Sequence, residues 1–223
     1  MKLDLHIHTT ASDGAWSPEA VGRAAAKGGL DVIAVSDHDT TAAFATASAV
    51  AAEVRLQVIP ALEVSSTHRD RDVHVLGYFV DPEADAMIAH RARATSRRDE
   101  RMQEMVDRLS ASGIEITFEQ VEEEAGPDRV AIGRPHLARA LVAAGHASSV
   151  HGAFNTLIGD GSDAFVPTRL LTPVEAVELI LASHGIPIWA HPPGDLVDPL
   201  LPELVRAGLR GLEVYRPSHK RHD

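Results

Sequence analysis

The stretch Lys2-Leu3-Asp4-Leu5-His6-Ile7-His8 determines how the rest of the chain is interpreted. Leu3, Leu5 and Ile7 alternate with polar residues, which is the period of a β-strand. The alternation places His6 and His8 together on the opposite face, with Cα atoms about 6–7 Å apart. Two imidazoles so placed can coordinate one metal ion from the same side. A His-x-His pair alone is as often merely solvated, so its meaning depends on the other residues of the chain.

Strand and helix signals alternate over the first eighty residues. Ser17-Pro18 supplies a cap and a first-turn proline for an alanine-rich helix that ends at Gly28-Gly29. The other elements predicted here are a strand at 32–35, a helix after Asp39-Thr40, a strand through 58–59 to Glu63, a loop at 65–72 and a strand at 73–76. Repeated strand–helix units predict an α/β fold with parallel strands, as a barrel or an open sheet.

The sequence pattern changes after Asp81-Pro82, where the apolar residues of a stretch of about eighty residues have helical spacing. Three helices are predicted there: a charged one near 84–111, one opened by Thr117 with Gln120 in capping-box register, and one starting at Pro135. Strands and helices then resume with a capping box at Thr172, a strand at 186–190, a helix at 200–207 and a strand at 211–215. We therefore predict a metal-binding domain formed by 1–82 and 166–223, interrupted by a helical insertion at 83–165.

Potential metal ligands stand at the ends of the predicted strands. They are His6, His8, His38, Glu63, His74 and His191, with Asp13 in the loop after the first strand. Parallel α/β folds place their sites at the carboxyl edge of the sheet, and independent core histidines have no reason to follow that rule. Seven ligands exceed the needs of one tetrahedral ion, so we expect two or three divalent ions.

Several of these positions have a simpler explanation when taken singly. Asp13 precedes Gly14 and fits an ordinary Asp-Gly turn, and His74 alone is more often a core histidine. Asp39 could cap the following helix, and Asp37 could orient the His38 imidazole. Together, the positions favour the metal site.

Composition limits the other possibilities. The formal net charge of −11 argues against a broad surface for duplex nucleic acid, although a local basic groove could still hold phosphates. Cysteine is absent, so the ligands must be nitrogen or oxygen, which suits Zn²⁺, Mn²⁺ or Fe²⁺. Neither a signal peptide nor a membrane span is evident, which predicts a cytoplasmic protein with no membrane partner. The oligomeric state cannot be predicted.

Taken in order, the motifs resemble the PHP (polymerase and histidinol phosphatase) superfamily, and in particular its stand-alone nucleotide phosphoesterases with a helical insertion. The matching motifs are Asp4-Leu5-His6-Ile7-His8-Thr9, Ser12-Asp13-Gly14, Ser36-Asp37-His38-Asp39, Glu63, His74, Gly133-Arg134-Pro135-His136 and Ala190-His191-Pro192. The resemblance implies a distorted (β/α)₇ barrel with a trinuclear Mn, Fe or Zn centre. It also implies hydrolysis of 3′,5′-bisphosphonucleotides or of short RNA from the 5′ end.

The resemblance also implies roles for individual residues. His6, His8 and Glu63 would hold a first metal, Glu63, His74 and His191 a second, and Asp13 with His38 a third. Glu63, His38 and Asp13 would thus be the catalytic residues. Arg134 and His219 would bind substrate phosphate, for which a guanidinium fork is well suited, although an arginine at a helix start is more often a surface charge. His136 could be a helix-start residue only.

The end of the sequence departs from the family pattern. The resemblance implies a further Asp-x-His motif well beyond Glu213-Val214-Tyr215, whereas the sequence stops at Asp223. The sequence therefore predicts a truncated chain whose barrel is incomplete at the C-terminus and which lacks two ligands. His219 would then belong to a frayed tail.

The leading functional prediction is a metal-dependent phosphoesterase that acts on nucleotides or short RNA through a metal-activated water. A phosphatase acting on histidinol phosphate shares the metal core and stays open as an alternative. So does a metal-binding or structural module without turnover.

Overall fold

The computed structural model describes residues 1–127 and 129–215. Within them, six strands form one sheet in the order β1-β2-β3-β4-β5-β6. The strands are β1 (Leu3–Ile7), β2 (Val32–Val35), β3 (Gln57–His68), β4 (Arg71–Tyr78), β5 (Ile186–Trp189) and β6 (Gly211–Leu212). The sheet is curled, which brings β4 near β1: the Tyr78 hydroxyl on β4 donates a hydrogen bond to the Leu5 carbonyl on β1 at 2.9 Å. The fold is a mixed α/β one with a curled half-barrel sheet, and the seven β/α units expected from the resemblance are not all present in the part of the chain that the structure describes.

The prediction of parallel strands throughout was wrong. The pairs β1–β2, β2–β3 and β5–β6 are parallel, but β4 is antiparallel to both β3 and β5. The predicted loop at 65–72 was wrong as well, because β3 continues to His68 and turns directly into β4. Arg69 and Asp70 make this two-residue turn, with φ values of 48° and 62°. Positive φ at both central residues suits a tight hairpin turn, but neither residue is the glycine or asparagine that signals one in a sequence.

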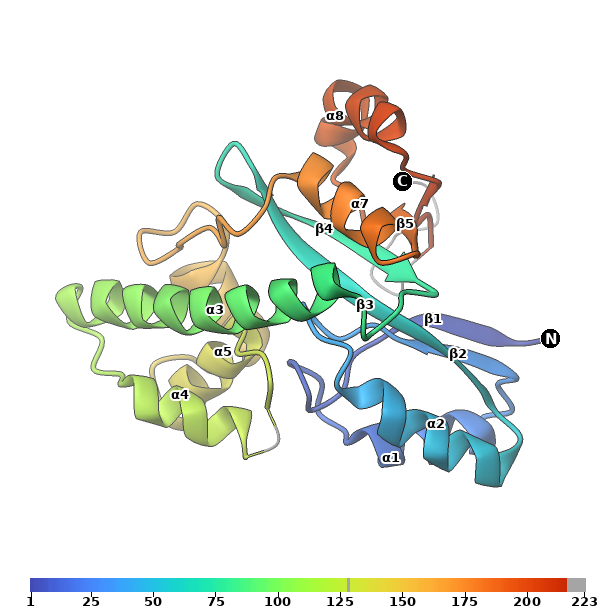
Figure 1. The fold of residues 1–223 in the computed structure, drawn as a ribbon. Helices are drawn as coiled ribbons and strands as arrows, with labels where there is room; N and C mark the ends of the chain where they lie inside the picture. Colours follow the sequence, from blue (N-terminus) through green and yellow to red (C-terminus); the bar gives the residue numbers. More distant parts are fainter. Residues whose placement is uncertain (128, 216–223) are drawn as a thin grey trace.

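Helices cover the outer face of the sheet on two sides (Figure 1). One pair, α1 (Pro18–Lys27) and α2 (Ala43–Val54), packs on the β1–β3 half. The other pair, α7 (Pro173–Ala182) and α8 (Gly194–Ala207), packs on the β3–β5 region around Trp189, which is fully buried. The predicted caps at Ser17 and Thr172 accept hydrogen bonds from the first turns of α1 and α7.

The helical insertion contains its own apolar cluster, drawn from residues 102–166. Its elements are α3 (Asp85–Ala111), α4 (Phe118–Ala125), α5 (Arg134–Ala143), α6 (Val150–Ala153) and the π-helix η1 (Phe154–Ile158). Thr117 and Gln120 form the predicted capping box of α4. The division into 1–82, 83–165 and 166–223 remains a prediction, which this separate core supports. No helix in the described ranges is both long and apolar enough to cross a bilayer.

Candidate metal centre

The inner side of the curled sheet carries the cluster of predicted ligands. The apolar alternation of β1 is interrupted, because its register with β2 shifts between Asp4 and Ile7. Leu5 consequently packs inside the curl, while Ile7 packs against the α1–α2 cluster. Such a bulge re-aims side chains. His6 and His8 are brought together with Nε2 atoms 3.1 Å apart.

The mixed sheet places the other ligands differently from the prediction. Glu63 follows Ile59 and Ala61 on the inward face of β3, and a bridge links it to His38 just after β2. His74 lies in the middle of β4, opposite Ser65, and not at the end of a parallel strand. His74 still reaches the cluster, because it pairs with Ser65 across the two strands. Ser65 and Glu63 are two residues apart on β3 and therefore share one face of the sheet.

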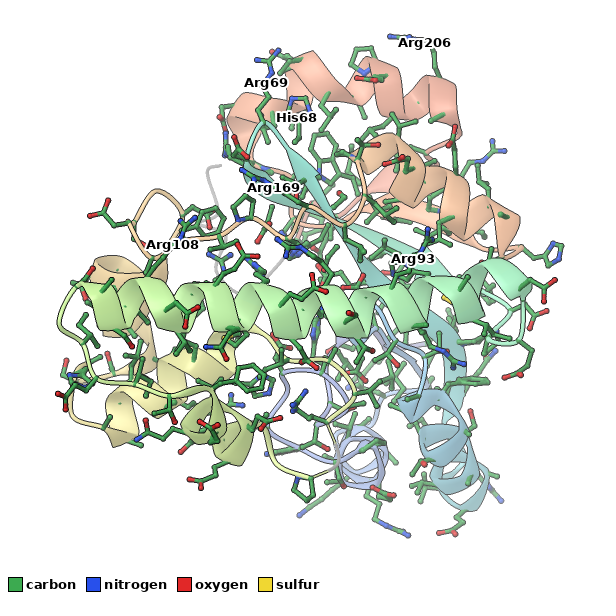
Figure 2. The ribbon with its side chains drawn as sticks, turned by 60° about the vertical axis from the view of Figure 1, so that its left-hand side comes forward. His68, Arg69, Arg93, Arg108, Arg169 and Arg206 are labelled. Carbon is green, nitrogen blue, oxygen red and sulfur yellow. The ribbon has the colours of Figure 1, made fainter. Side chains whose placement is uncertain are left out.

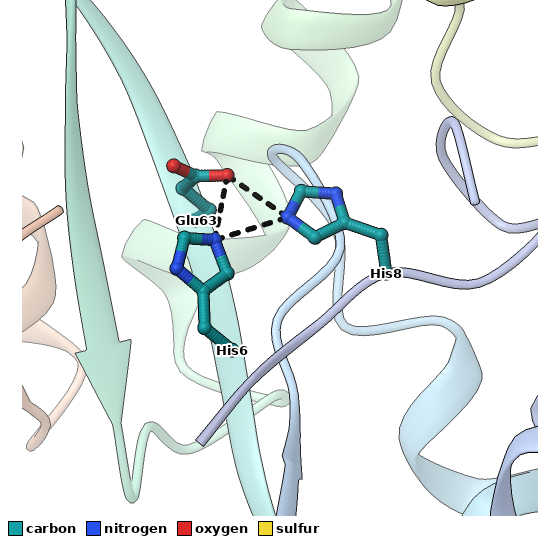
Figure 3. A group of neighbouring side chains, drawn as sticks. All are labelled: His6, His8 and Glu63. Carbon is teal, nitrogen blue, oxygen red and sulfur yellow. Dashed lines mark hydrogen bonds and ion pairs between the residues drawn. The ribbon is translucent and has the colours of Figure 1, made fainter. Parts of the chain in front are cut away.

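Glu63 is the centre of the cluster, with only 1% of its side chain exposed. Its Oε2 lies 3.3 Å from His6 Nε2 and 3.0 Å from His8 Nε2, and these three side chains converge in Figure 3. The same oxygen lies 3.3 Å from His38 Nδ1. Its Oε1 lies 3.1 Å from His74 Nδ1 and 2.9 Å from His191 Nε2. One buried carboxylate therefore faces five imidazoles.

Asp13 forms the other acidic point of the cluster. Its Oδ1 lies 2.8 Å from His8 Nδ1, and its Oδ2 lies 3.6 Å from His38 Nε2. The loop that carries Asp13 is tied down by Asp37, which accepts hydrogen bonds from Thr9 N at 2.7 Å and from the Ser12 hydroxyl at 2.6 Å. Asp37 thus orients this loop, and the alternative that it orients the His38 imidazole was wrong.

The protonation states of the cluster are strongly coupled. Burial disfavours a charge on His6 and His8, but contacts with Glu213, Asp13 and Glu63 outweigh it and raise their pKa values to about 9 and about 10. Burial lowers the pKa of His38 to about 3, even though Glu63 and Asp13 favour its charged form. Burial also opposes ionisation of Glu63, yet the surrounding imidazoles hold its pKa well below the ordinary value. Burial opposes ionisation of Asp13 too, but His38 and His8 lower its pKa, so Glu63 and Asp13 are both anionic at neutral pH and suited to cations.

The donor set fits divalent metal ions. Three groups have ligand atoms close enough to share one ion: His6, His8 and Glu63; His8, Asp13 and His38; and His38, Glu63 and His74. Among the described residues, Glu63 Oε2, His38 Nδ1 and His74 Nδ1 are buried and have no hydrogen-bond partner. Buried polar atoms normally have hydrogen-bond partners. A lone pair that coordinates a metal ion needs no hydrogen bond, so these three atoms are suited to be metal ligands.

Asp39 does not cap α2, so that alternative was also wrong. Its φ of 55° turns it away from the helix, whose preceding residue, Ala42, makes no side-chain cap. Asp39 Oδ2 instead accepts from Arg98 Nε at 2.8 Å, and Oδ1 lies 3.0 Å from His90 Nε2. Arg98 also donates to the Ile132 carbonyl. This buried network fastens α3 of the insertion beside the metal cluster.

A cavity of about 140 Å³ opens between the cluster and the insertion. Arg98, Arg101 and Arg134 line it together with Asp13, His38 and His74. Guanidinium groups so close to the predicted metal ligands make a suitable pocket for a phosphate.

Arg134 and His136, both in the predicted substrate motif, have different surroundings. The Arg134 guanidinium lies 5.0 Å from the Phe165 ring centroid, and its Nη1 donates to Asp160 at 2.6 Å. His136 is buried and accepts a hydrogen bond from Gly133 N at 2.9 Å, so it serves the start of α5. His219 lies outside the described residues.

The sequence analysis missed Glu213. This residue follows β6, and its Oε1 lies 2.9 Å from His6 Nδ1 while its Oε2 accepts from the His191 backbone N–H at 2.8 Å. The sequence analysis placed Glu213 in the middle of a strand predicted at 211–215, whereas β6 ends at Leu212, so Glu213 follows a strand end as His191 does.

Comparisons with known proteins identify relatives of this chain. The PHP domain family profile matches residues 4–125. The 5′-3′ exoribonuclease Rnm of Escherichia coli is 35% identical over 191 residues, which cover 85% of this chain and 64% of that protein. The 3′,5′-nucleoside bisphosphate phosphatase of Chromobacterium violaceum is 31% identical over 227 residues, covering 99% of this chain and 79% of that protein.

A solved structure contains the fold of this chain. It is described as a putative metal-dependent phosphoesterase from Bifidobacterium adolescentis and superposes with a TM-score of 0.89 at 31% identity. The match covers 99% of this chain and 79% of that one. The chain thus spans about two thirds to four fifths of the length of these relatives.

Proposed function

The chain belongs to the PHP domain family, and from that premise we propose that it is a metal-dependent phosphoesterase acting on nucleotides or short RNA. The observation that carries the proposal is the position of Glu63. This carboxylate is buried among five imidazoles, and the arginine-lined cavity lies directly beside the cluster. A buried carboxylate between two sets of imidazoles is suited to bridge closely spaced cations.

We assign two or three divalent ions of Mn, Fe or Zn to the cluster. His6, His8 and Glu63 would hold the first, and Glu63, His74 and His191 the second. Asp13 and His38 would hold the third, and Asp13 would also accept a hydrogen bond from Nδ1 of His8, whose other nitrogen faces the first site. Such ions supply an activated water and neutralise the charge that develops on the phosphoryl group.

The residues around the cavity would orient the substrate. Arg134 and Arg101 can form charge-assisted hydrogen bonds to phosphate oxygens, while His38 and Asp13 line the wall that leads to the metals. Asp72 lies 2.7 Å from Arg101 and 3.6 Å from Arg134, and so holds the two guanidinium groups near one another. A phosphate bound between them would stand next to the proposed metal centre.

Two substrate classes fit, because the relatives named above act on a bisphosphonucleotide or on RNA. Exposed arginines close to the cavity favour the inclusion of short RNA, despite the net charge of −11. Figure 2 labels Arg69 and Arg169 near the β3–β4 hairpin and Arg108 on α3; all three are exposed, and Arg169 also pairs with Asp70 at 2.7 Å. Arg169 directly follows Thr168, which lines the cavity. A single strand whose first phosphate occupies the cavity could continue over this surface.

The test is a substrate panel with the metal-loaded protein. It contains a 3′,5′-bisphosphonucleotide, a 5′-phosphorylated oligoribonucleotide of about five nucleotides, and histidinol phosphate. We expect phosphate release or mononucleotide release from the first two, and loss of both when a chelator removes the metal. Hydrolysis of histidinol phosphate alone would refute the nucleotide assignment, and inactivity on all three would favour a structural module.

Two substitutions refine the panel. Arg134→Lys keeps the charge but loses the planar fork, so we expect a higher KM for both nucleotide substrates, by about tenfold or more. The double change Arg69→Ser with Arg169→Ser should weaken only the longer RNA, with a smaller dependence on salt. Arg23→Ser, on the exposed face of α1, is the matched control and should change neither.

A further inference from the structure

The Glu213 carboxylate makes two contacts, one to each of two predicted metal ligands. Its Oε1 lies 2.9 Å from Nδ1 of His6, and its Oε2 accepts a 2.8 Å hydrogen bond from the backbone N–H of His191. The side chain is 16% exposed, so it is largely withdrawn from water. Its backbone is fixed as well, because Glu213 N donates to the Trp189 carbonyl at 2.8 Å.

The contact with His6 defines which ring nitrogen faces the cluster. An ionised carboxylate only accepts hydrogen bonds, so His6 Nδ1 must carry the proton. Nε2, which lies 3.3 Å from Glu63 Oε2, is then the ring nitrogen that would give up its proton to a metal ion and donate its lone pair to that ion. Carboxylates that bind the second nitrogen of a metal-binding histidine fix its tautomer and ring orientation and increase its basicity.

The contact with His191 acts on the backbone. His191 has a φ of 30°, a conformation that a residue with a Cβ adopts only at a cost. The hydrogen bond from its N–H to Glu213 holds this turn, and the turn aims Nε2 to within 2.9 Å of Glu63 Oε1. One carboxylate thereby restrains ligands on both sides of Glu63.

We propose that Glu213 is a positioning residue that holds His6 and His191 in the geometry needed to bind metal on both sides of Glu63. This inference rests on the proposed metal centre and adds to it a residue that is not itself a ligand. Both of its oxygens are already engaged, one with the far side of an imidazole and the other with a backbone amide.

The first measurement is metal affinity, made by calorimetric titration of metal-free protein with Zn²⁺ in the absence of substrate. Loss of such an outer partner typically weakens metal binding by 10- to 100-fold, and we expect a loss in that range for Glu213→Ala. Glu213→Gln retains one acceptor and can satisfy only one of its two partners, so its loss should be smaller. Glu203→Gln, at an exposed position of α8, is the control and should match the wild type.

The second measurement separates positioning from a general effect on folding. In the Zn²⁺-loaded wild type, a ¹⁵N–¹H spectrum should show the His6 Nδ1–H protected from exchange with water. In Glu213→Ala, with Zn²⁺ in excess, this proton should exchange faster while the amide spectrum away from β1, β5 and β6 is retained.

The two proposals fail in different ways. If the wild type bound no Zn²⁺, the metal centre itself would be wrong. If the wild type bound Zn²⁺ and Glu213→Ala bound it equally well with a protected His6 proton, the metal centre would stand and the role of Glu213 would be overturned.

Discussion

The buried pair of Arg98 and Asp39 allows a quantitative test of how the insertion is attached to the sheet. Arg98 lies on α3 and is 4% exposed, and Asp39 follows β2 and is 2% exposed. Their closest nitrogen–oxygen distance is 2.7 Å. Arg98 also donates to the Ser65 hydroxyl at 2.6 Å and to the Ile132 carbonyl at 3.0 Å. The perturbation is Arg98→Met, which keeps much of the length of the side chain and removes the charge.

The magnitude is set by the groups that lose their partner. After Arg98→Met, Asp39 keeps the Ser65 N–H at 2.8 Å and the His90 ring, but loses its cationic partner inside the protein. Removal of one member of a buried ion pair costs about 3–5 kcal/mol, because the other charge is then uncompensated. Against a total stability of about 5–15 kcal/mol, this loss is large.

The assay is urea unfolding of the metal-free protein, followed by circular dichroism. We expect about 3–5 kcal/mol of destabilisation for Arg98→Met and a similar loss for Asp39→Asn. The double variant should lose at least about 2 kcal/mol less than the sum, because the second change removes a charge that is already unpaired. Arg23→Ala breaks an exposed pair with Glu53 and should cost less than about 1 kcal/mol. Full additivity of the two buried changes, or a cost near that of Arg23→Ala, would refute the argument.

Three other perturbations test the cluster and its supports. Glu63→Gln keeps the shape but removes the negative charge that five imidazoles share, so elemental analysis should find the metal lost; unchanged metal content would exclude the bridging role. Burial lowers the pKa of His136 to about 4 from 6.5, so between these values the unfolded chain binds a proton that the native state does not. Stability should therefore fall by up to about 3 kcal/mol as the pH drops through this window, and thermal melts of His136→Asn should show a flatter slope. A Cβ on Gly14 would lie 2.4 Å from the His8 carbonyl oxygen, so Gly14→Ala should lower the melting temperature, by the equivalent of about 1–3 kcal/mol, whereas Gly194→Ala, with open space around it, should not.

Much of the architecture was accessible from local patterns. The caps at Ser17, Thr117 and Thr172 mark real helix starts, because a cap depends on groups within three residues of one another. The direction of β4 was not accessible, because Arg69-Asp70 carries no turn signal and both parallel and antiparallel strands have a period of two. A long loop was therefore predicted where the chain turns back at once.

The sequence by itself determined most of the residues that meet in the cluster. The residue types and their placement at strand ends selected His6, His38, Glu63 and His191, and the structure brings these side chains into one cluster. For His38 and His191, which follow the ends of β2 and β5, the reason is geometric: strand ends at one edge of a sheet converge, so the position of these residues along the chain carries information about proximity.

Only the tertiary structure decided how these residues are held. His74 reaches Glu63 from an antiparallel strand, and Asp39 binds Arg98 fifty-nine residues away and does not cap a helix. Glu213 joins His6 across 207 residues of sequence. Such partnerships depend on the curl of the sheet and on the docking of the insertion, which no local period encodes.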